Sequence, residues 1–181
     1  MIRLFVGIAL PDLLRERLAA LGGGLPNARW VAPENLHLTL RFIGEVDEAT
    51  GHEIHEALAA VRAPAFFFEL AGFDLFGSGS RAHTLWAGVE RNPPLAHLRE
   101  KIESALVRLG LPPDTRKFSP HVTVARLNNV PAGRLRGFLA GNGLFRSGPV
   151  PCDRFTLFSS RLGRNGASYA AEAEYTLEGP P

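Results

Sequence analysis

Apolar residues follow two different periods along this chain, and these periods predict where its strands and helices lie. An apolar residue stands at every second position of residues 2–8, which predicts a strand because side chains two apart share a face. From Pro11 to Leu21 the leucines recur instead at helical spacing, and the glycines at 22–24 predict the end of that helix.

The same two periods extend along the rest of the chain. They predict further strands over residues 35–43, 65–75, 84–89, 119–127, 155–160 and 171–177. They also predict helices that begin after Asp47 and after Asn92, and a short helix around residues 135–139. Strands and helices are mixed without a strict β-α-β rhythm, so we predict an α+β fold. No segment is typical of a linker, which predicts a single domain over residues 1–181.

The composition is that of an ordinary globular protein. Of the 181 residues, 45% are hydrophobic and 21% are charged, so disorder is not expected. The single cysteine, Cys152, excludes an internal disulfide and a multi-cysteine metal site. No apolar run approaches the roughly 18 residues of a membrane span, and the N-terminus lacks the features of a signal peptide. We therefore expect a cytoplasmic protein that works away from membranes.

Positive charge is concentrated in one part of the chain. Nine Lys or Arg residues stand between Arg116 and Arg164 against one acid, Asp153, whereas the whole chain has a net charge of only +2. A solvated basic face explains such a block as well as a binding site does. If the block binds a partner, that partner is anionic, and the predominance of arginine suits phosphate groups.

One short pattern occurs twice, as Asn-Leu-His-Leu-Thr-Leu around His37 and as Ser-Pro-His-Val-Thr-Val around His121. On a strand, His37 and Thr39 share one face, and so do His121 and Thr123. The apolar residues between them can be buried, which leaves each His-Thr pair to line a polar site. A single pair of this kind is more often a half-exposed histidine bonded to its neighbour, but the matched repeat favours a functional site.

Two such histidines predict acid–base chemistry on a phosphodiester. Histidine has an unperturbed pKa of about 6.5, so one ring can accept a proton from water while the other donates a proton to a departing sugar oxygen. The hydroxyls of Thr39 and Thr123 can donate hydrogen bonds to the non-bridging phosphate oxygens, where the transition state holds its charge. This chemistry requires no metal, and we expect no cofactor.

Other histidines and aromatic residues carry weaker patterns. His52 and His55 are three residues apart rather than the four of a zinc-protease helix, and they predict a solvated helix face. His83 and His97 have no partner pattern. Core packing explains most of the aromatic residues that are also candidates for stacking on a base, which are Trp30, Phe42, Phe118 and Tyr169.

The two His-x-Thr motifs and their surroundings resemble the 2H phosphoesterase superfamily, and most closely the RNA 2',3'-cyclic phosphodiesterase family, historically called 2'-5' RNA ligase. The resemblance rests on His-Leu-Thr-Leu-Arg-Phe-Ile-Gly-Glu from His37, Phe-Ser-Pro-His-Val-Thr-Val-Ala-Arg from Phe118, Arg-Leu-Phe-Val-Gly-Ile from Arg3 and Trp-Val-Ala-Pro-Glu-Asn from Trp30. It extends through nearly the whole chain.

This resemblance implies a bilobal α+β fold, in which two pseudo-symmetric lobes of mostly antiparallel sheet, with helices outside, face each other across a central cleft. It implies hydrolysis of an RNA 2',3'-cyclic phosphate to a 2'-phosphate, with His37 as the acid and His121 as the base. Thr39 and Thr123 become the phosphate donors. Arg126 matches a basic residue close to the second motif in the family, which implies a phosphate contact. Strict alternation, however, places Arg126 on the opposite face of its strand from His121.

Three other functions remain open on sequence grounds. They are the reverse reaction, which joins RNA ends through a 2'-5' linkage; binding of RNA or nucleotides without turnover; and hydrolysis of a small cyclic nucleotide or an ADP-ribose cyclic phosphate. The basic block favours an RNA substrate with a cyclic phosphate end, tRNA fragments among them, and the presence of both motifs favours catalysis. We expect the protein to act as a monomer.

Overall fold

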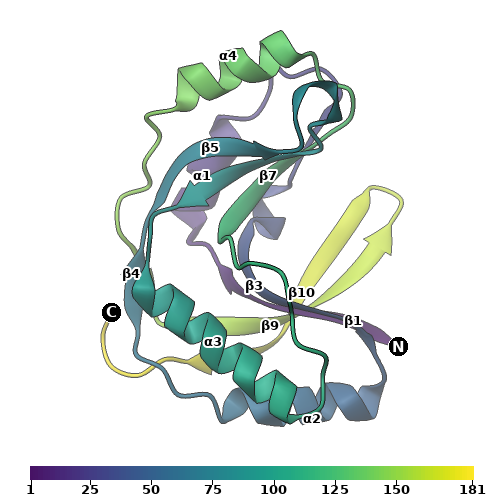
Figure 1. Ribbon diagram of the computed structural model, residues 1–181, viewed down its shortest axis with the longest axis vertical. Helices are drawn as coiled ribbons and strands as arrows, with labels where there is room; N and C mark the ends of the chain where they lie inside the picture. The colour runs from purple at the N-terminus through teal and green to yellow at the C-terminus, as the bar shows by residue number, and fades with distance from the viewer.

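The computed structural model describes residues 1–181, which form ten strands, four α-helices and two short 3-10 turns (Figure 1). The strands are β1 (Ile2–Ala9), β2 (Ala28–Trp30), β3 (His37–Val46), β4 (Phe66–Phe68), β5 (Leu70–Phe76), β6 (Thr84–Val89), β7 (His121–Leu127), β8 (Val150–Cys152), β9 (Arg154–Gly163) and β10 (Gly166–Thr176). The helices are α1 (Asp12–Ala20), α2 (Glu48–Ala59), α3 (Pro93–Arg108) and α4 (Ala132–Asn142), and the 3-10 turns are η1 (Pro33–Asn35) and η2 (Gly79–Arg81).

Eight of the strands form two antiparallel sheets of four strands each. The first sheet has the order β10-β9-β1-β3 and the second β2-β7-β6-β5, while β4 and β8 pair with each other. The two sheets meet where β3 lies against β7. In Figure 1 the first sheet crosses the lower part, with its β9–β10 hairpin rising at the right, α2 below it and α3 at the lower left. The second sheet lies in the upper part with α4 above it. The prediction of an α+β fold with two lobes of antiparallel sheet is confirmed.

One face of the first sheet is buried against helices α2 and α3. Leu4, Val6 and Ile8 of β1 are each no more than 3% exposed, as their alternation predicts. Helix α2 buries Ile54 and Leu58 in the same hydrophobic core, and α3 buries five residues of its apolar face. Burial of each leucine or isoleucine side chain among them stabilises the fold by about 1.5–3 kcal/mol. The opposite face of the sheet carries His37 and is called the histidine-bearing face below.

Helices α1, α2 and α3 begin where the sequence predicts. The side chain of Asp47 accepts a hydrogen bond from the backbone N–H of Thr50 at 2.8 Å, and that of Asn92 accepts one from the N–H of Leu95 at 2.9 Å. Both therefore cap N–H groups that have no partner inside the helix. Helix α1 ends just before the predicted glycines at 22–24. No helix is long and apolar enough to cross a membrane.

Several predicted elements differ from the structure. Strand β10 begins at Gly166 rather than at residue 171, and β9 runs to Gly163 rather than to residue 160. The strand expected over residues 65–75 is divided in two, because β4 pairs with β8 whereas β5 pairs with β6. The short helix expected around residues 135–139 extends over Ala132–Asn142. The sequence does not predict β2 and β8, since three residues are too few to carry a recognisable period.

Candidate active site

The two motif strands bring the histidines into one neighbourhood. Strand β3 begins at His37, strand β7 begins at His121, and these strands lie against each other where the sheets meet. The structure therefore joins two sequence motifs that are far apart along the chain.

The His37 ring is held in one tautomer by its own turn of chain. Its Nδ1 lies 2.7 Å from the carbonyl oxygen of Asn35, and its Nε2 lies 3.0 Å from the hydroxyl of Thr39. A carbonyl oxygen can only accept, so we assign the proton to Nδ1, and the Thr39 hydroxyl donates to Nε2. The rings of Phe5 and Tyr169 pack beside His37, with centroids 4.8 and 5.1 Å away. These contacts fix the orientation of the His37 ring.

The His121 ring repeats this arrangement in the second sheet. Its Nδ1 donates to the carbonyl oxygen of Ser119 at 2.7 Å, which assigns the same tautomer. The rings of Phe76 and Trp86 pack around it, with centroids 4.9 and 5.7 Å away. Unlike His37, His121 has no hydrogen bond from its neighbouring threonine, so its Nε2 is available to a water molecule.

The environment of His37 lowers its pKa below the ordinary value of 6.5. Burial is the main cause, since it disfavours the charged ring, and the positive charges of His121, Arg15 and Arg126 act in the same direction. The hydrogen bond to the Asn35 carbonyl opposes them because it stabilises the protonated ring. At neutral pH the ring of the free protein is therefore mostly uncharged.

A β-bulge occurs at the same place in both motif strands. Val6 and Gly7 of β1 pair with Arg41 and Thr39, which leaves Leu40 without a partner. In the second sheet Leu85 and Trp86 pair with Ala125 and Thr123, which leaves Val124 without one. One extra residue reverses the alternation of side chains beyond it.

The bulge resolves the conflict over Arg126. Val124 and Ala125 are both buried, and the next residue, Arg126, is exposed. Arg126 pairs across the sheet with Thr84, which lies two residues before Trp86 and shares its face. Arg126 therefore lies on the same face as His121, contrary to the expectation from strict alternation. In β3 the same reversal turns Phe42 onto the histidine-bearing face.

Arg126 is held in place without being neutralised. Its Nη1 donates a hydrogen bond of 3.0 Å to the hydroxyl of Thr84, a residue that is 1% exposed. It forms no ion pair with a carboxylate, and neither does Arg15 on α1, whose charge also reaches His37. Unpaired guanidinium groups beside two histidines suit an anionic ligand. The sequence does not point to Arg15 or Trp86, because neither belongs to a motif.

Two glycines, each paired with a motif residue, allow the backbone of a neighbouring strand to approach closely. Gly7 pairs with Thr39, and a Cβ added to it would lie 2.8 Å from the carbonyl oxygen of Leu38 and 3.6 Å from Cδ2 of His37. Gly88 pairs with His121, and a Cβ there would lie 2.8 Å from the carbonyl oxygen of Ala71. Only glycine fits these positions without displacing backbone.

Of the remaining histidines, His83 lies beside this neighbourhood, because its ring packs on Phe76, which also packs on His121. His52 is exposed and lies 4.0 Å from Glu56, and His55 bonds to the hydroxyl of Tyr175 at 2.9 Å, so both have structural partners on α2 or beside it. The Nδ1 atom of His83 bonds to the Thr84 hydroxyl. No group of three or more His, Cys, Asp or Glu residues is arranged to hold a metal ion.

The four aromatic residues proposed for stacking divide into two groups. Trp30 packs against Phe138, with ring centroids 5.8 Å apart, and the Phe118 ring lies beneath the guanidinium of Arg99 at 5.5 Å. Tyr169 packs on His37, and Phe42 is 38% exposed. Phe42 is therefore the most exposed of the four rings.

These features define a class of protein: two antiparallel sheets that each present a His-x-Thr strand, with the histidines in one tautomer and an unpaired arginine beside them. The family model described as the 2'-5' RNA ligase superfamily matches residues 11–164, and the chain belongs to this family. The resemblance drawn from the two motifs is thereby confirmed.

Known proteins are similar to this chain over most of its length. The RNA 2',3'-cyclic phosphodiesterase of Aeropyrum pernix is 37% identical over 160 residues, which cover 86% of this chain and 88% of that protein. The RNA 2',3'-cyclic phosphodiesterase of Thermotoga maritima is 37% identical over 166 residues, which cover 91% of this chain and 86% of that protein. The crystal structure of Escherichia coli LigT complexed with 3'-AMP matches with a TM-score of 0.78 and 27% identity, and covers 97% of this chain and 98% of that chain.

Proposed function

We propose that this protein hydrolyses the 2',3'-cyclic phosphate at the end of an RNA to a 2'-phosphate by acid–base catalysis between His37 and His121, without a metal. The main support is that Nδ1–H of each ring donates to a backbone carbonyl oxygen, so that Nε2 of each ring can take part in proton transfer. The similar proteins of Aeropyrum pernix and Thermotoga maritima support the choice of substrate, since each is named an RNA 2',3'-cyclic phosphodiesterase.

In this proposal His121 is the base and His37 is the acid. The Nε2 atom of His121 removes a proton from water, and the water oxygen attacks phosphorus. The bond from phosphorus to the 3' oxygen breaks, and Nε2–H of His37 gives its proton to that oxygen. The free Nε2 of His121 supports the assignment of the base, because water can reach it without displacing a hydrogen bond. Each proton transfer contributes about 10²–10⁴ to the rate.

The hydroxyls of Thr39 and Thr123 and the guanidinium of Arg126 bind the non-bridging phosphate oxygens. In the free protein Thr39 bonds to Nε2 of His37, so it must turn towards the phosphate before His37 can act. Arg126 forms no ion pair that would have to break before it binds a phosphate, and its hydrogen bond to Thr84 uses only Nη1. Donors held in this way stabilise the charge that develops on the oxygens in the transition state.

The substrate itself helps to protonate the acid. The lowered pKa of His37 leaves its ring mostly uncharged at neutral pH in the free protein. A cyclic phosphate is an anion, and an opposite charge beside the ring favours the protonated form and raises its pKa. Binding therefore shifts His37 towards the state in which it can donate.

RNA is the proposed substrate rather than a small cyclic nucleotide. The exposed Phe42 ring on the histidine-bearing face can stack on a base, and the basic block can attract the rest of the strand. Both histidines come from one chain, so we also propose that residues 1–181 act as a single domain and as a monomer. A second function, joining of RNA ends through a 2'-5' linkage, uses the same atoms in reverse and is favoured by the family description.

The test is the hydrolysis of a short RNA that ends in a 2',3'-cyclic phosphate, in buffer containing EDTA. We expect a 2'-phosphate product, identified by phosphorus NMR, with a bell-shaped pH dependence from one acid and one base. A 3'-phosphate product, or activity that requires added metal, would contradict the proposed mechanism. Incubation of the product with a 5'-hydroxyl RNA tests the joining reaction, and a yield at background would exclude it.

A further inference from the structure

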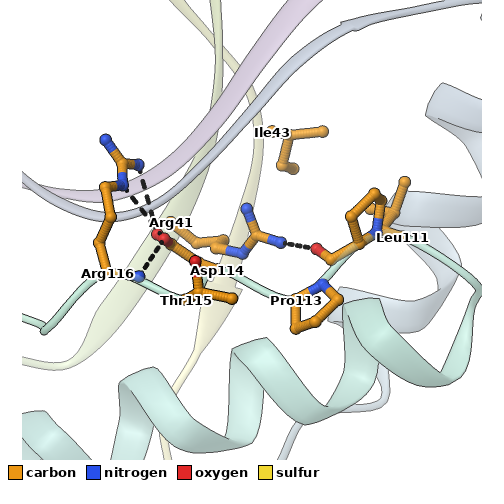
Figure 2. A pocket seen from close by; sticks show the side chains of 8 residues that line it. Arg41, Ile43, Leu111, Pro113, Asp114, Thr115 and Arg116 are labelled. Atoms are coloured by element: carbon orange, nitrogen blue, oxygen red, sulfur yellow. Dashed lines mark hydrogen bonds and ion pairs between the residues drawn. The ribbon is translucent and has the colours of Figure 1, made fainter.

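A cluster of charged residues lies on the face of β3 that points away from the histidines. Arg41, which follows the bulged residue Leu40, is only 8% exposed. Its guanidinium donates hydrogen bonds to the carboxylate of Glu103 on α3, to the carbonyl of Phe42 at 2.6 Å and to the carbonyl of Pro112. Figure 2 shows the bond to Pro112 beside a pocket of about 310 Å³ that Arg41 helps to line.

Glu103 connects this arginine to the segment between α3 and β7. One of its oxygens accepts from Arg41, and the other accepts a 2.7 Å hydrogen bond from the backbone N–H of Asp114. The guanidinium of Arg99 lies 4.0 Å from Glu103 and 3.7 Å from the Asp114 carboxylate. Arg41, Arg99, Glu103 and Asp114 therefore form one network, called the Arg41 cluster here.

The Arg41 cluster supports a segment that has little other support. No backbone-to-backbone hydrogen bond fixes residues 112–120, which lead directly into β7. The carbonyl of Pro112 and the N–H of Asp114 are held instead by side chains of the cluster. Arg99 also lies over the ring of Phe118, with its guanidinium carbon 5.5 Å from the ring centroid.

The same network reaches both histidines. Arg41 lies two residues beyond Thr39 on the strand that begins with His37. At the other end Phe118 precedes Ser119, whose carbonyl accepts the Nδ1 proton of His121. The position of the His121 ring thus depends on a segment that the cluster fastens to the strand of His37.

We propose that the Arg41 cluster positions His121 relative to His37, with Glu103 as its central positioning residue. The inference rests on the proposed function for its catalytic readout. Glu103 lies between two arginines, so loss of its charge leaves Arg41 and Arg99 without their shared carboxylate. The segment before His121 then loses its fixed distance from β3, and small displacements of a catalytic group are enough to slow a reaction strongly.

The test compares Glu103→Gln with Glu100→Gln, a matched control on the exposed side of the same helix. The Glu103→Gln substitution keeps the shape of the side chain and an oxygen for the Asp114 N–H, but it removes the charge. For this variant we expect kcat to fall by about 10-fold with KM nearly unchanged, because the phosphate donors are untouched. Glu100→Gln should match the wild type, and an equal kcat for all three proteins would overturn the proposal.

A binding measurement separates positioning from partial unfolding. The 2'-phosphate product needs only the phosphate donors, whereas a nucleoside–vanadate adduct imitates the transition state and needs both histidines in line. For Glu103→Gln we expect an unchanged Kd for the product, a Kd about 10-fold weaker for the vanadate adduct, and one site per chain. Unchanged Kd values with fewer sites per chain would show partial unfolding and overturn the proposal.

Two further measurements keep the inference testable in every case. If Glu103→Gln does not fold, Asp114→Asn is tested instead, because it weakens the contact of Arg99 with Asp114 but keeps the bond between Arg41 and Glu103. For Asp114→Asn we expect a smaller increase in the Kd for the vanadate adduct than for Glu103→Gln. If the wild type hydrolyses no cyclic phosphate, the proposed function fails, but NMR of the histidine rings still tests the cluster. His121 ring signals should move in Glu103→Gln and not in Glu100→Gln, and unmoved signals would overturn the inference.

Discussion

Phe42 and Arg126 occupy equivalent places in the two motif strands, each five residues beyond its histidine. In both strands a bulge turns this position onto the face that carries the histidine. Phe42 is 38% exposed, with the guanidinium carbon of Arg3 5.2 Å from its ring centroid, whereas Arg126 presents a cation held by Thr84. One place offers an aromatic surface and the other a positive charge, so the two motif strands are not chemically equivalent beyond their threonines.

Replacement of either histidine should remove hydrolysis. For His37→Asn and His121→Asn we expect kcat/KM for cyclic-phosphate RNA to fall by about 10²–10⁴-fold each, because each variant loses one proton transfer. The double variant should lose little more than either single one, since the two residues act as a unit. Initial rates, with circular dichroism to check the fold, make the measurement. A single variant with wild-type rates would exclude that histidine from the chemistry.

Replacement of Arg126 should weaken transition-state binding. For Arg126→Ala we expect kcat/KM to fall by about 10²–10³-fold, the usual loss for one donor to a developing oxyanion. Arg126→Lys should recover only part of this loss, because an ammonium group cannot bind two oxygens with a rigid fork. The control is Arg136→Ala on the exposed surface of α4. If both alanine variants lose the same activity, a general effect of charge explains it better than a phosphate contact.

The His37 ring should titrate below 6.5 in the free protein, where burial and three nearby positive charges disfavour its protonation. NMR of the histidine ring protons measures this pKa directly. Arg15→Gln removes one of the charges, so the pKa of His37 should rise towards its ordinary value. An unchanged titration in this variant would mean that the Arg15 guanidinium does not act on the ring.

The same shift predicts how stability depends on pH. Below pH 6.5 the unfolded chain binds a proton at His37 more readily than the folded protein does, because the folded pKa is lowered. The contribution of His37 to the free energy of unfolding is therefore constant above that pH, falls as pH decreases below it, and levels off beneath the folded pKa. Urea unfolding of the wild type and of His37→Asn across this range measures the difference between their free energies of unfolding. This difference should become smaller towards low pH.

Gly7→Ala should damage stability and activity together. Its Cβ would lie 2.8 Å from the Leu38 carbonyl and 3.6 Å from the His37 ring, so backbone must move. We expect a loss of about 1–3 kcal/mol in the free energy of unfolding, as for other overpacked sites, and a lower kcat. Gly137→Ala on α4 is the control, because a Cβ there meets nothing within 4 Å. A Gly7→Ala variant as stable as the wild type would show that β1 and β3 can separate freely.

Cys152 should be unreactive in the folded protein. It is 3% exposed, and burial raises the pKa of its thiol to about 12. The thiolate is the reactive form, so modification by a disulfide reagent at about pH 8 should be slow until the protein is unfolded. Rapid modification under native conditions would indicate that β8 opens readily.

The sequence predicts the positions of both motif strands well, because Leu38, Leu40, Val122 and Val124 alternate with the His-Thr pairs and are all buried. It does not predict the direction of the side chains beyond Thr39 and Thr123. A bulge depends on how a strand is paired with its neighbour, and the pairing of Gly7 and Val6 with β3 is not visible in the local pattern. The expectation that Arg126 lies on the face opposite His121 is therefore wrong, because the bulge at Val124 reverses the alternation before Arg126 is reached.

Residues that reach the site from other elements are harder to find. Trp86 comes from β6 and packs on His121, while Arg15 comes from α1 and acts on His37. Each is locally an ordinary residue of an amphipathic strand or helix. These residues reach the histidines only in the folded protein. The spacing of apolar residues along the sequence does not show which elements pack together.

The order of strands has a consequence for synthesis. The second sheet takes all its strands from residues 28–127, whereas the first joins β1 and β3 to β9 and β10. Phe158 and Tyr169, which pack against His37, lie on β9 and β10. A growing chain can therefore complete one sheet, and already contain both histidines, while the surroundings of His37 are still unmade. The ring contacts around His37 would be completed only once the β9–β10 hairpin has left the ribosome and closed onto β1.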